Sequence, residues 1–311
     1  MRDDIEISVV IPTRNEESNV AAIAAAVIAQ LDAAGATYEL IFIDNVSSDA
    51  TVPLVKAMCA ANPRIKLIVN TRNFGQMRSP THGIFQAQGR GVINMCADFQ
   101  DDPALIGQFI ARWRGGAPIV LGVRESEEGG SLPLRVARNA AYGIGSRLGD
   151  YKLIPNATGF GIYDRRVVDT IKALNEPEPF FRGLLVETGY PIATIGFPRK
   201  PRAGGRSNNN FWALLDFTIS GLASWSKKLL RAPMFLAVFV GVGALLALLA
   251  APVAALAGWP AWPWLVAALA EAQVAALLFF LGLVGDQLRH VSERTRGFPL
   301  VVEGERVNFD A

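Results

Sequence analysis

Cysteine and histidine are scarce in this sequence, with two of each among 311 residues. Cys59 and Cys96 lie in apolar segments, so they indicate a domain in the cytosol rather than a disulfide framework. His82 falls in a predicted helix, where a structural role is favoured, and the sequence does not point to a histidine base. The formal net charge is only +2, and we expect no nucleic-acid partner.

Charge is missing altogether from residues 232–270. A helix that spans a bilayer needs about 20 apolar residues, so this run predicts one span at 233–257 and the start of a second at 263–285. Three tryptophans around a Pro/Gly turn at 258–264 suit the far interface of a hairpin, and basic residues on both flanks predict that both ends are cytoplasmic. The alternative is a buried soluble hairpin.

These patterns predict a folded domain at 1–206, an interfacial helix at 207–230, a two-span transmembrane hairpin at 231–288 and a cytoplasmic tail at 289–311. Aromatic residues and a basic end favour the interfacial helix, although a core helix would show a similar pattern. The N-terminus has no apolar run of the kind that a signal peptide carries. We expect a multi-pass protein of the inner (cytoplasmic) membrane with its large domain in the cytoplasm.

The first half of the chain alternates short apolar runs with helical periodicity. Continuous apolar runs of this kind predict an α/β domain with a mostly parallel sheet covered on both faces. Ligands of such sheets bind beyond the carboxyl ends of the strands. The predicted strands are 7–11, 40–43, 65–69, 92–95 and 118–121.

Polar segments follow three of these strands, at 12–17, 44–51 and 96–103. Asn15 is a candidate cap of the next helix and Asp49 of the one after it. Asp101 and Asp102 precede a proline and are interpreted as charges at a helix N-terminus. Each segment alone could be an ordinary strand-to-helix turn. Carboxylate and amide oxygens at 98 and 100 could equally serve a hard cation such as Mg²⁺ or Mn²⁺.

In this order the segments resemble the inverting family 2 glycosyltransferases with the GT-A fold, a Rossmann-like architecture. The resemblance is closest to the subgroup that makes polyprenyl-phosphate sugars, such as dolichyl-phosphate mannose synthases and bactoprenol glucosyltransferases. It extends over nearly the whole chain, including the C-terminal hairpin. Further matching segments are 70–76 (NTRNFGQ), 122–124 (GVR), 158–165 (TGFGIYDR) and 180–183 (FFRG).

The resemblance implies a catalytic domain that takes a UDP- or GDP-linked sugar as donor and a polyprenyl phosphate as acceptor. It implies that the nucleotide-sugar is held by Pro12, Glu16, Asp44 and Asp98. The metal, Mg²⁺ or Mn²⁺, would be held by Asp98 and Gln100. The acceptor phosphate would be held by arginines, whose planar fork suits phosphate oxygens: Arg124 and Arg135, with Arg138 and Arg202. Asp98, Arg124 and Arg135 would be the catalytic residues.

The sequence departs from the family pattern at several places. Cys96 stands where the family's Asp-x-Asp motif begins with an aspartate, which removes one carboxylate. Gly159 and Gly161 stand where many relatives have Asp and Arg. A catalytically silent scaffold in a membrane glycosylation complex is therefore the alternative function. A transferase that extends a lipid-linked glycan is a third, and a homo-oligomer is possible in each case.

Overall fold

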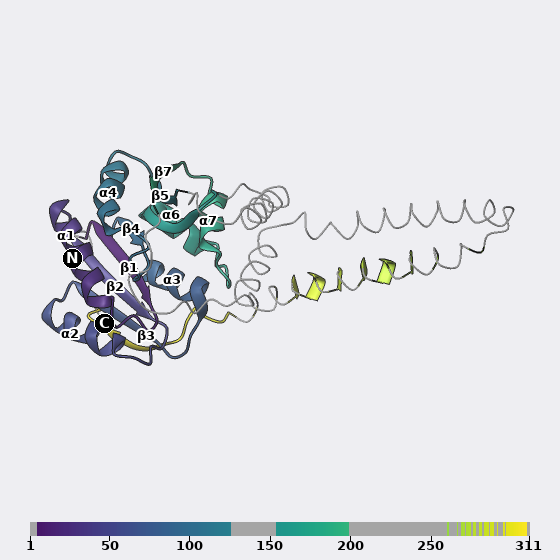
Figure 1. The fold of residues 1–311 in the computed structure, drawn as a ribbon, viewed down its shortest axis with the longest axis horizontal. Coiled ribbons are helices and arrows are strands. Elements are labelled where there is room, and N and C mark those ends of the chain that lie inside the picture. Colours follow the sequence, from purple (N-terminus) through teal and green to yellow (C-terminus); the bar gives the residue numbers. More distant parts are fainter. Residues whose placement is uncertain are drawn as a thin grey trace. The chain divides into compact units, whose positions relative to one another are not determined.

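The computed structural model describes residues 5–125, 154–198, 260, scattered positions between 266 and 295, and 297–309. The chain divides into two compact units (Figure 1). The first comprises residues 1–139, 151–210 and 297–311, and the second comprises 140–150 and 211–296. Most of the first unit is described, and it contains all of the strands discussed below.

The first unit is built on an eight-stranded sheet in the order β7-β5-β6-β4-β1-β2-β3-β8. Neighbours β4-β1-β2-β3 are parallel, as are β5 and β7, whereas β6 and β8 run antiparallel to their partners. The strands are β1 Ile7–Thr13, β2 Tyr38–Asp44, β3 Ile65–Asn70, β4 Gly91–Asn94, β5 Ile119–Arg124, β6 Ala157–Asp164, β7 Ile192–Phe197 and β8 Glu303–Val307. All five strands predicted from apolar runs are confirmed.

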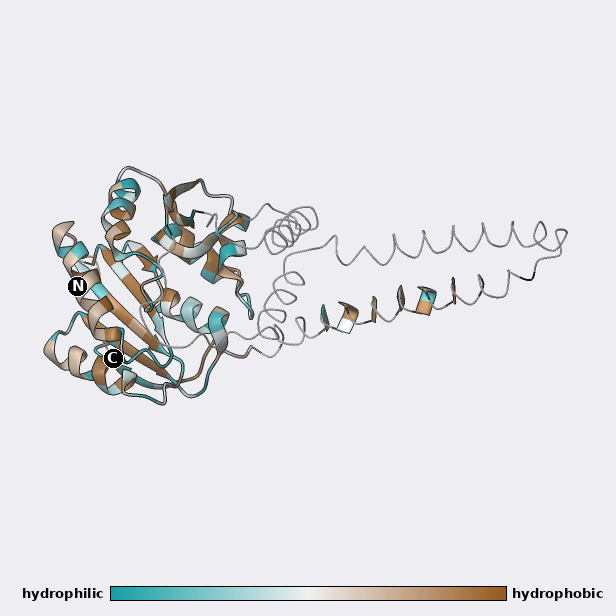
Figure 2. Ribbon diagram, viewed as in Figure 1, coloured by the Kyte–Doolittle hydropathy of each residue, from teal (hydrophilic) through white to brown (hydrophobic). Residues whose placement is uncertain are grey.

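Both faces of the central strands are buried, and alternate residues of one strand enter different clusters. Val9 faces a core completed by α1 (Val20–Ala33), α2 (Thr51–Ala61) and α4 (Ile106–Arg114). Val10 faces a second core completed by α3 (Gly75–Gln86), α6 (Arg165–Ala173) and α7 (Phe181–Glu187). The strands are accordingly the hydrophobic centre of the unit in Figure 2. Such three-layer burial explains why their sequences read as unbroken apolar runs.

Strand β8 comes from the far end of the chain and closes the edge beside β3. This region was predicted to belong to a separate cytoplasmic tail at 289–311, but residues 303–307 complete the sheet. The Val302 carbonyl accepts hydrogen bonds from the Thr71 amide and hydroxyl, at 2.9 and 3.1 Å. The Asn308 side chain donates to the carbonyls of Cys59 and Ile65, both at 2.8 Å.

Two polar side chains of the sheet and of α3 are also held by this C-terminal segment. The buried Lys66 ammonium pairs with Glu39 at 2.7 Å and lies 5.2 Å from the centre of the Phe309 ring. His82 lies in α3, as predicted, and contacts Glu303 at 2.5 Å. Burial lowers the pKa of His82, which favours the neutral ring. These contacts give His82 a structural role.

The second unit is described only at scattered helical positions between 266 and 295. Several of its described side chains are apolar and exposed: Val266, Val274, Leu277, Leu281, Leu288 and Val291. Among the residues that the structure describes, no helix is both long enough and apolar enough to cross a bilayer. The predicted interfacial helix, the first span and nearly all of the tryptophan turn lie outside the described residues, and the second span is described in part.

The anchoring of β8 yields a stability prediction at Asn308, whose φ of 61° is left-handed. Asn308→Ala removes two hydrogen bonds and leaves a side chain poorly suited to this backbone, so it should lower the free energy of unfolding by about 2–3 kcal/mol. Asn175→Ala is the matched control, because Asn175 has a φ of 49° and reports the backbone term alone, about 1 kcal/mol. Thermal unfolding followed by circular dichroism measures both. Equal losses would contradict the anchoring role.

Candidate active site

The three polar segments that the sequence singled out meet at one edge of the sheet. Strand β1 lies between β4 and β2 and is parallel to both. Thr13 at the end of β1 is level with Asp44 at the end of β2. The carboxyl ends of three neighbouring strands therefore carry the segments 12–17, 44–51 and 96–103, as predicted.

The loops after β1 and β2 interlock. The Asn15 amide donates to the Ser47 hydroxyl and the Ser48 amide donates to the Asn15 side chain, each at 2.8 Å. Further along, the Glu16 amide donates to the Thr51 hydroxyl at 2.8 Å. The prediction that Asn15 caps the following helix is wrong, because α1 begins only at Val20 and the Asn15 amide group is used to join the two loops.

Asp44 is fully buried in this interlocked region. One of its carboxylate oxygens accepts from the Ser47 amide at 2.8 Å, and the other accepts from the hydroxyls of Thr13 and Ser47. The carboxylate thus organises its own loop. Glu16 is also buried and accepts from the Asn19 side chain at 2.7 Å.

Asp49 lies next to the start of α2, and Pro12 lies inside strand β1. Asp49 accepts from the amide and the hydroxyl of Thr51, the first residue of α2, at 3.0 and 2.5 Å. Its other oxygen accepts from the Glu17 amide at 3.1 Å. Pro12 lies within β1 beside Ile43 of β2. Asp49 therefore binds the first residue of α2, although the N-cap residue is Ala50 and not Asp49. Pro12 belongs to strand β1 and does not follow it, and its role in holding the nucleotide-sugar stays a prediction.

Three residues other than glycine have left-handed backbone at this edge. They are Asn15, Val46 and Phe99, with φ values of 56°, 60° and 60°. Asparagine tolerates this conformation, but a bulky or β-branched residue pays about 1–2 kcal/mol for it. Backbone strain of this kind gathers at functional sites. Apart from Asn15, the sequence carries no sign of it, because these φ angles are imposed by the tertiary structure.

The loop after β4 carries the predicted metal ligands. Asp98 and Gln100 lie in one tight turn, in which the Gln100 amide donates to Asp98 at 3.1 Å. Asp102 accepts from the Ala104 amide at 3.2 Å and caps the short 3-10 helix Pro103–Leu105, as predicted. Cys96 is partly exposed to water. Even so, the protein packed around its thiol, and the charges of Asp101 and Asp98, raise its pKa well above the usual value.

Asp101 is not a helix charge, and that prediction is wrong. Its side chain is buried, with one oxygen accepting from the Cys96 amide at 3.0 Å and the other pairing with Arg124 at 3.1 Å. Burial raises the pKa of the carboxyl, although the Cys96 amide and Arg124 both act to lower it. The pair joins the loop after β4 to the last residue of β5.

Arg124 is the one predicted acceptor-binding arginine within the described residues. Its side chain is 19% exposed, and its buried Nε has no hydrogen-bond partner among the described residues. The guanidinium is therefore held by Asp101 through one Nη, and part of the side chain remains accessible. Arg135, Arg138 and Arg202 lie outside the described residues, and their assignment to the acceptor stays a prediction.

Gly161, one of the departures from the family pattern, has a packing reason. A Cβ atom at this position would lie 2.3 Å from the Val120 carbonyl oxygen on β5. Gly159 has a φ of 89°, and its carbonyl accepts the hydroxyl of Tyr163. Gly161 thus lets β6 approach β5 closely, whereas Gly159 supplies a backbone conformation that other residues rarely adopt.

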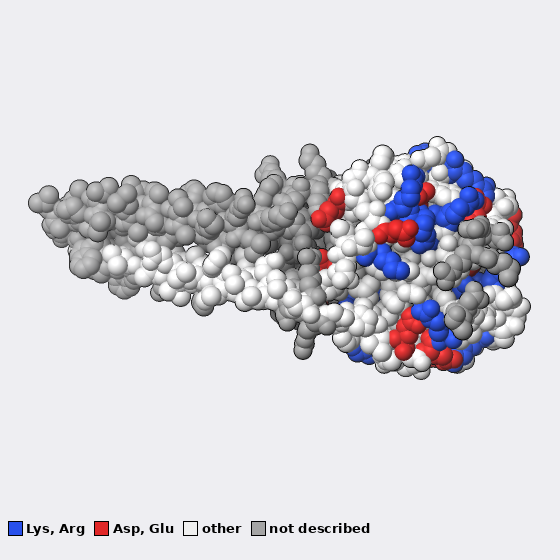
Figure 3. Space-filling model, turned by 180° about the vertical axis from the view of Figure 1, so that it is seen from behind, with Lys and Arg blue, Asp and Glu red and all other residues white. Residues whose placement is uncertain are grey.

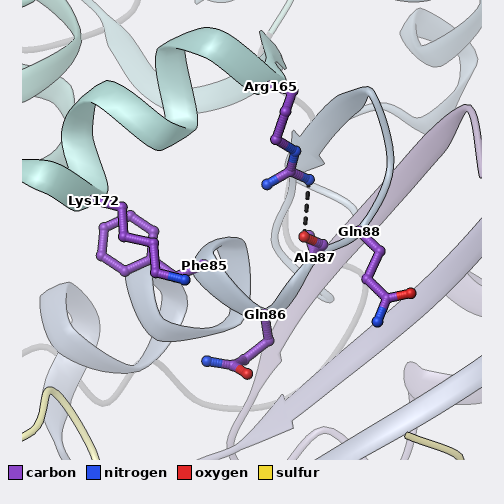
Figure 4. A pocket seen from close by; sticks show the side chains of 6 residues that line it. All are labelled: Phe85, Gln86, Ala87, Gln88, Arg165 and Lys172. Carbon is purple, nitrogen blue, oxygen red and sulfur yellow. Dashed lines mark hydrogen bonds between the residues drawn. The ribbon is translucent and has the colours of Figure 1, made fainter. Parts of the chain in front are cut away.

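A hollow of about 310 Å³ lies elsewhere, at the C-terminus of α3 and beside α6 (Figure 4). The Arg165 side chain donates to the carbonyls of Ala87 and Gly89 there, and so fastens the turn before β4. This is the amino end of β4, away from the edge described above. Acidic and basic side chains are interspersed over the face of the first unit shown in Figure 3. Neither feature competes with the strand edge as the active site.

Comparison with known proteins agrees with this geometry. A sequence profile described as "Glycosyl transferase family 2" matches residues 8–172, which include the β1, β2 and β4 segments. The chain belongs to glycosyl transferase family 2.

Similar glycosyltransferases cover most of the chain. It is 32% identical to an uncharacterized glycosyltransferase of Synechocystis over 95% of this chain and 94% of that one. It is 29% identical to the bactoprenol glucosyl transferase of Shigella phage SfV over 76% and 77%. Its fold is similar to that of glucosyl-3-phosphoglycerate synthase from Mycobacterium tuberculosis, solved with Mn²⁺, UDP-glucose and phosphoglyceric acid. That likeness has 18% identity, a TM-score of 0.50 and coverage of 71% and 79%, and it supports the predicted GT-A architecture.

The Asp101–Arg124 pair gives a testable consequence for this glycosyltransferase. Asp101→Asn removes the charge partner of a mostly buried arginine, which should lower the free energy of unfolding by about 3 kcal/mol. Asp102→Asn alters the adjacent, more exposed carboxylate and should cost about 1 kcal/mol or less. Chemical denaturation of the purified proteins measures both values. A loss at Asp101 no larger than at Asp102 would show that the pair does not hold the loop.

Proposed function

We propose that this glycosyltransferase moves a sugar from a nucleotide-sugar to a polyprenyl phosphate, with inversion, at the cytoplasmic membrane face. The observation that carries the acceptor assignment is the similarity to a bactoprenol glucosyl transferase over three quarters of each chain. The donor assignment is supported by the convergence of the loops after β1, β2 and β4 at the carboxyl edge of the sheet, where α/β sheets bind their ligands.

The reaction depends mainly on holding the donor sugar and the acceptor phosphate in the correct positions. A phosphate monoester is already anionic near neutral pH, so the acceptor oxygen can attack the anomeric carbon without a strong base. The new bond to the acceptor oxygen forms as the bond to the nucleoside diphosphate breaks on the opposite side, which inverts the anomeric carbon. Arg124, held by Asp101 at 3.1 Å, retains N–H groups that can bind the acceptor phosphate.

The side chains of the β4 loop suit a metal that is held mainly by the donor. Within the described part of the chain, no group of three or more His, Cys, Asp or Glu side chains is placed to bind a cation. Asp101 is engaged by Arg124 and the Cys96 amide, so the cation would be held by Asp98 and Gln100, which lie in the same turn of this loop. Mg²⁺ binds through one or two carboxylates together with phosphates and water, which fits this set. The ion, Mg²⁺ or Mn²⁺, would supply positive charge to the departing diphosphate.

The membrane topology follows from β8, if residues 211–296 enter the bilayer. The chain leaves the first unit before residue 211 and returns to it at residue 297. Because β8 is hydrogen-bonded to β3, both ends of this insertion lie in one compartment. An even number of spans is therefore required, in agreement with the basic residues on both flanks.

Transfer itself is tested with the full chain in detergent. Radiolabel from one of a panel of UDP- and GDP-sugars should enter an organic-extractable lipid when polyprenyl phosphate is supplied. Asp98→Asn should cut the rate at least ~100-fold, because one preorganised electrostatic partner is lost. Asp169→Asn, at an exposed position of α6, is the control and should retain activity. The absence of transfer from every donor would favour the silent-scaffold alternative.

Topology is tested by cysteine labelling in intact cells, in a background with Cys96 replaced by serine. A cysteine at Ala311 should stay unlabelled by an impermeant maleimide, whereas one at Ala261, in the tryptophan turn, should be labelled. The Ala261 variant shows that the reagent reaches the outer surface. Labelling of Ala311→Cys from outside would rule out the two-span arrangement with a cytoplasmic sheet.

A further inference from the structure

Val46 has a strained backbone conformation that, unlike those of Asn15 and Phe99, is offset neither by its residue type nor by packing in the core. Its φ is 60°, and 45% of its surface is exposed. Asn15 has similar backbone but belongs to a residue type that tolerates it. Phe99 is strained too, yet its side chain packs against the first core cluster. An exposed β-branched residue in this conformation, at the edge of an active site, indicates a role outside folding.

The residues on either side of Val46 fix its position. The Asn45 amide donates to the Thr13 carbonyl at 3.0 Å. The Asn45 side chain accepts from the Asn70 amide group at 3.0 Å and from the Phe74 amide at 3.2 Å. On the other side, the Ser47 amide donates to Asp44. The backbone is thus held from strands β1, β2 and β3, and the isopropyl group is presented at a defined place.

The position of the Val46 side chain suits a contact with the base of the donor nucleotide. Strand β1 lies between β2 and β4, and neighbouring strands are about 4.8 Å apart. The loop that carries Val46 is therefore about 10 Å from the strand that carries the Asp98 loop. If the diphosphate binds at the Asp98 loop, the β2 side of the edge, about 10 Å away, is the place for the base. An isopropyl group offers nothing to a charged diphosphate or to sugar hydroxyls, but it packs well against the flat face of a nucleobase.

Burial of Asp44 strengthens this assignment. Its carboxylate is enclosed and already accepts hydrogen bonds from Thr13 and Ser47. In this conformation it supports its own loop, and the exposed surface of the loop includes the side chain of Val46. We propose that Val46 is a specificity-determining residue of the donor site and forms an apolar wall against the nucleobase. The inference rests on the proposed use of a nucleotide-sugar.

A substitution that relieves the strain should separate stability from binding. Val46→Asn places a residue that accepts left-handed backbone at this position and removes the apolar wall. The melting temperature of the full chain should rise by about 2–4 °C. The dissociation constant for the nucleoside diphosphate that the unaltered protein binds, UDP or GDP, should become roughly five times larger. Inhibition by inorganic pyrophosphate, which has no base, should be unchanged.

Leu54→Asn is the matched control. Leu54 is an apolar residue of α2 with 39% of its surface exposed, so the same polar change is made on helical backbone. It should neither raise the melting temperature nor alter nucleotide affinity. Unchanged nucleotide affinity in Val46→Asn would overturn the inference, and so would equal weakening of nucleotide and pyrophosphate. Failure of the unaltered protein to bind either nucleotide would instead overturn the proposed donor class.

Discussion

The parallel pairing of β1 with β2 on one side and β4 on the other is the constraint on which the active site depends. These strands are buried on both faces, so polar side chains can gather only beyond their ends. The chain uses the carboxyl ends, where Thr13, Asp44 and the Asp98 loop come together. The hydrogen bonds between the β1 and β2 loops then convert a shared edge into one rigid surface.

Most carboxylates of the site are bonded to other groups of the protein. Asp44 supports its own loop, Asp49 joins two loops and Asp101 holds Arg124. Asp98 and Gln100 are the proposed ligands of the cation, and Arg124 is joined to the same loop through Asp101. This arrangement suits a reaction in which donor and acceptor both bring phosphate charge, because a protein with many free carboxylates at the same edge would repel them.

The sequence predicted those parts of the structure that local patterns determine. Unbroken apolar runs identified five strands, and their alternation with helices identified the α/β class and the edge that carries the site. Strand β8 was missed because its sequence, EGERV, is polar, and it becomes a strand only by pairing with β3. Asn15 and Asp101 were misread because their partners are distant in sequence: Ser48 lies in the loop after β2, and Arg124 is the last residue of β5. The left-handed backbone of Val46 likewise depends on contacts that are distant in sequence.

The position of β8 near the end of the chain also means that the sheet cannot be completed until synthesis is almost finished. Strand β3 ends at Asn70, but its outer neighbour begins only at Glu303. At ordinary rates of synthesis the ribosome needs roughly 10–50 s to reach it. Throughout that interval β3 is an open sheet edge, the kind of surface that recruits other chains. A nascent domain of this protein therefore carries an unpaired edge until β8 has been made, and a chain cut short after residue 296 would keep that edge exposed.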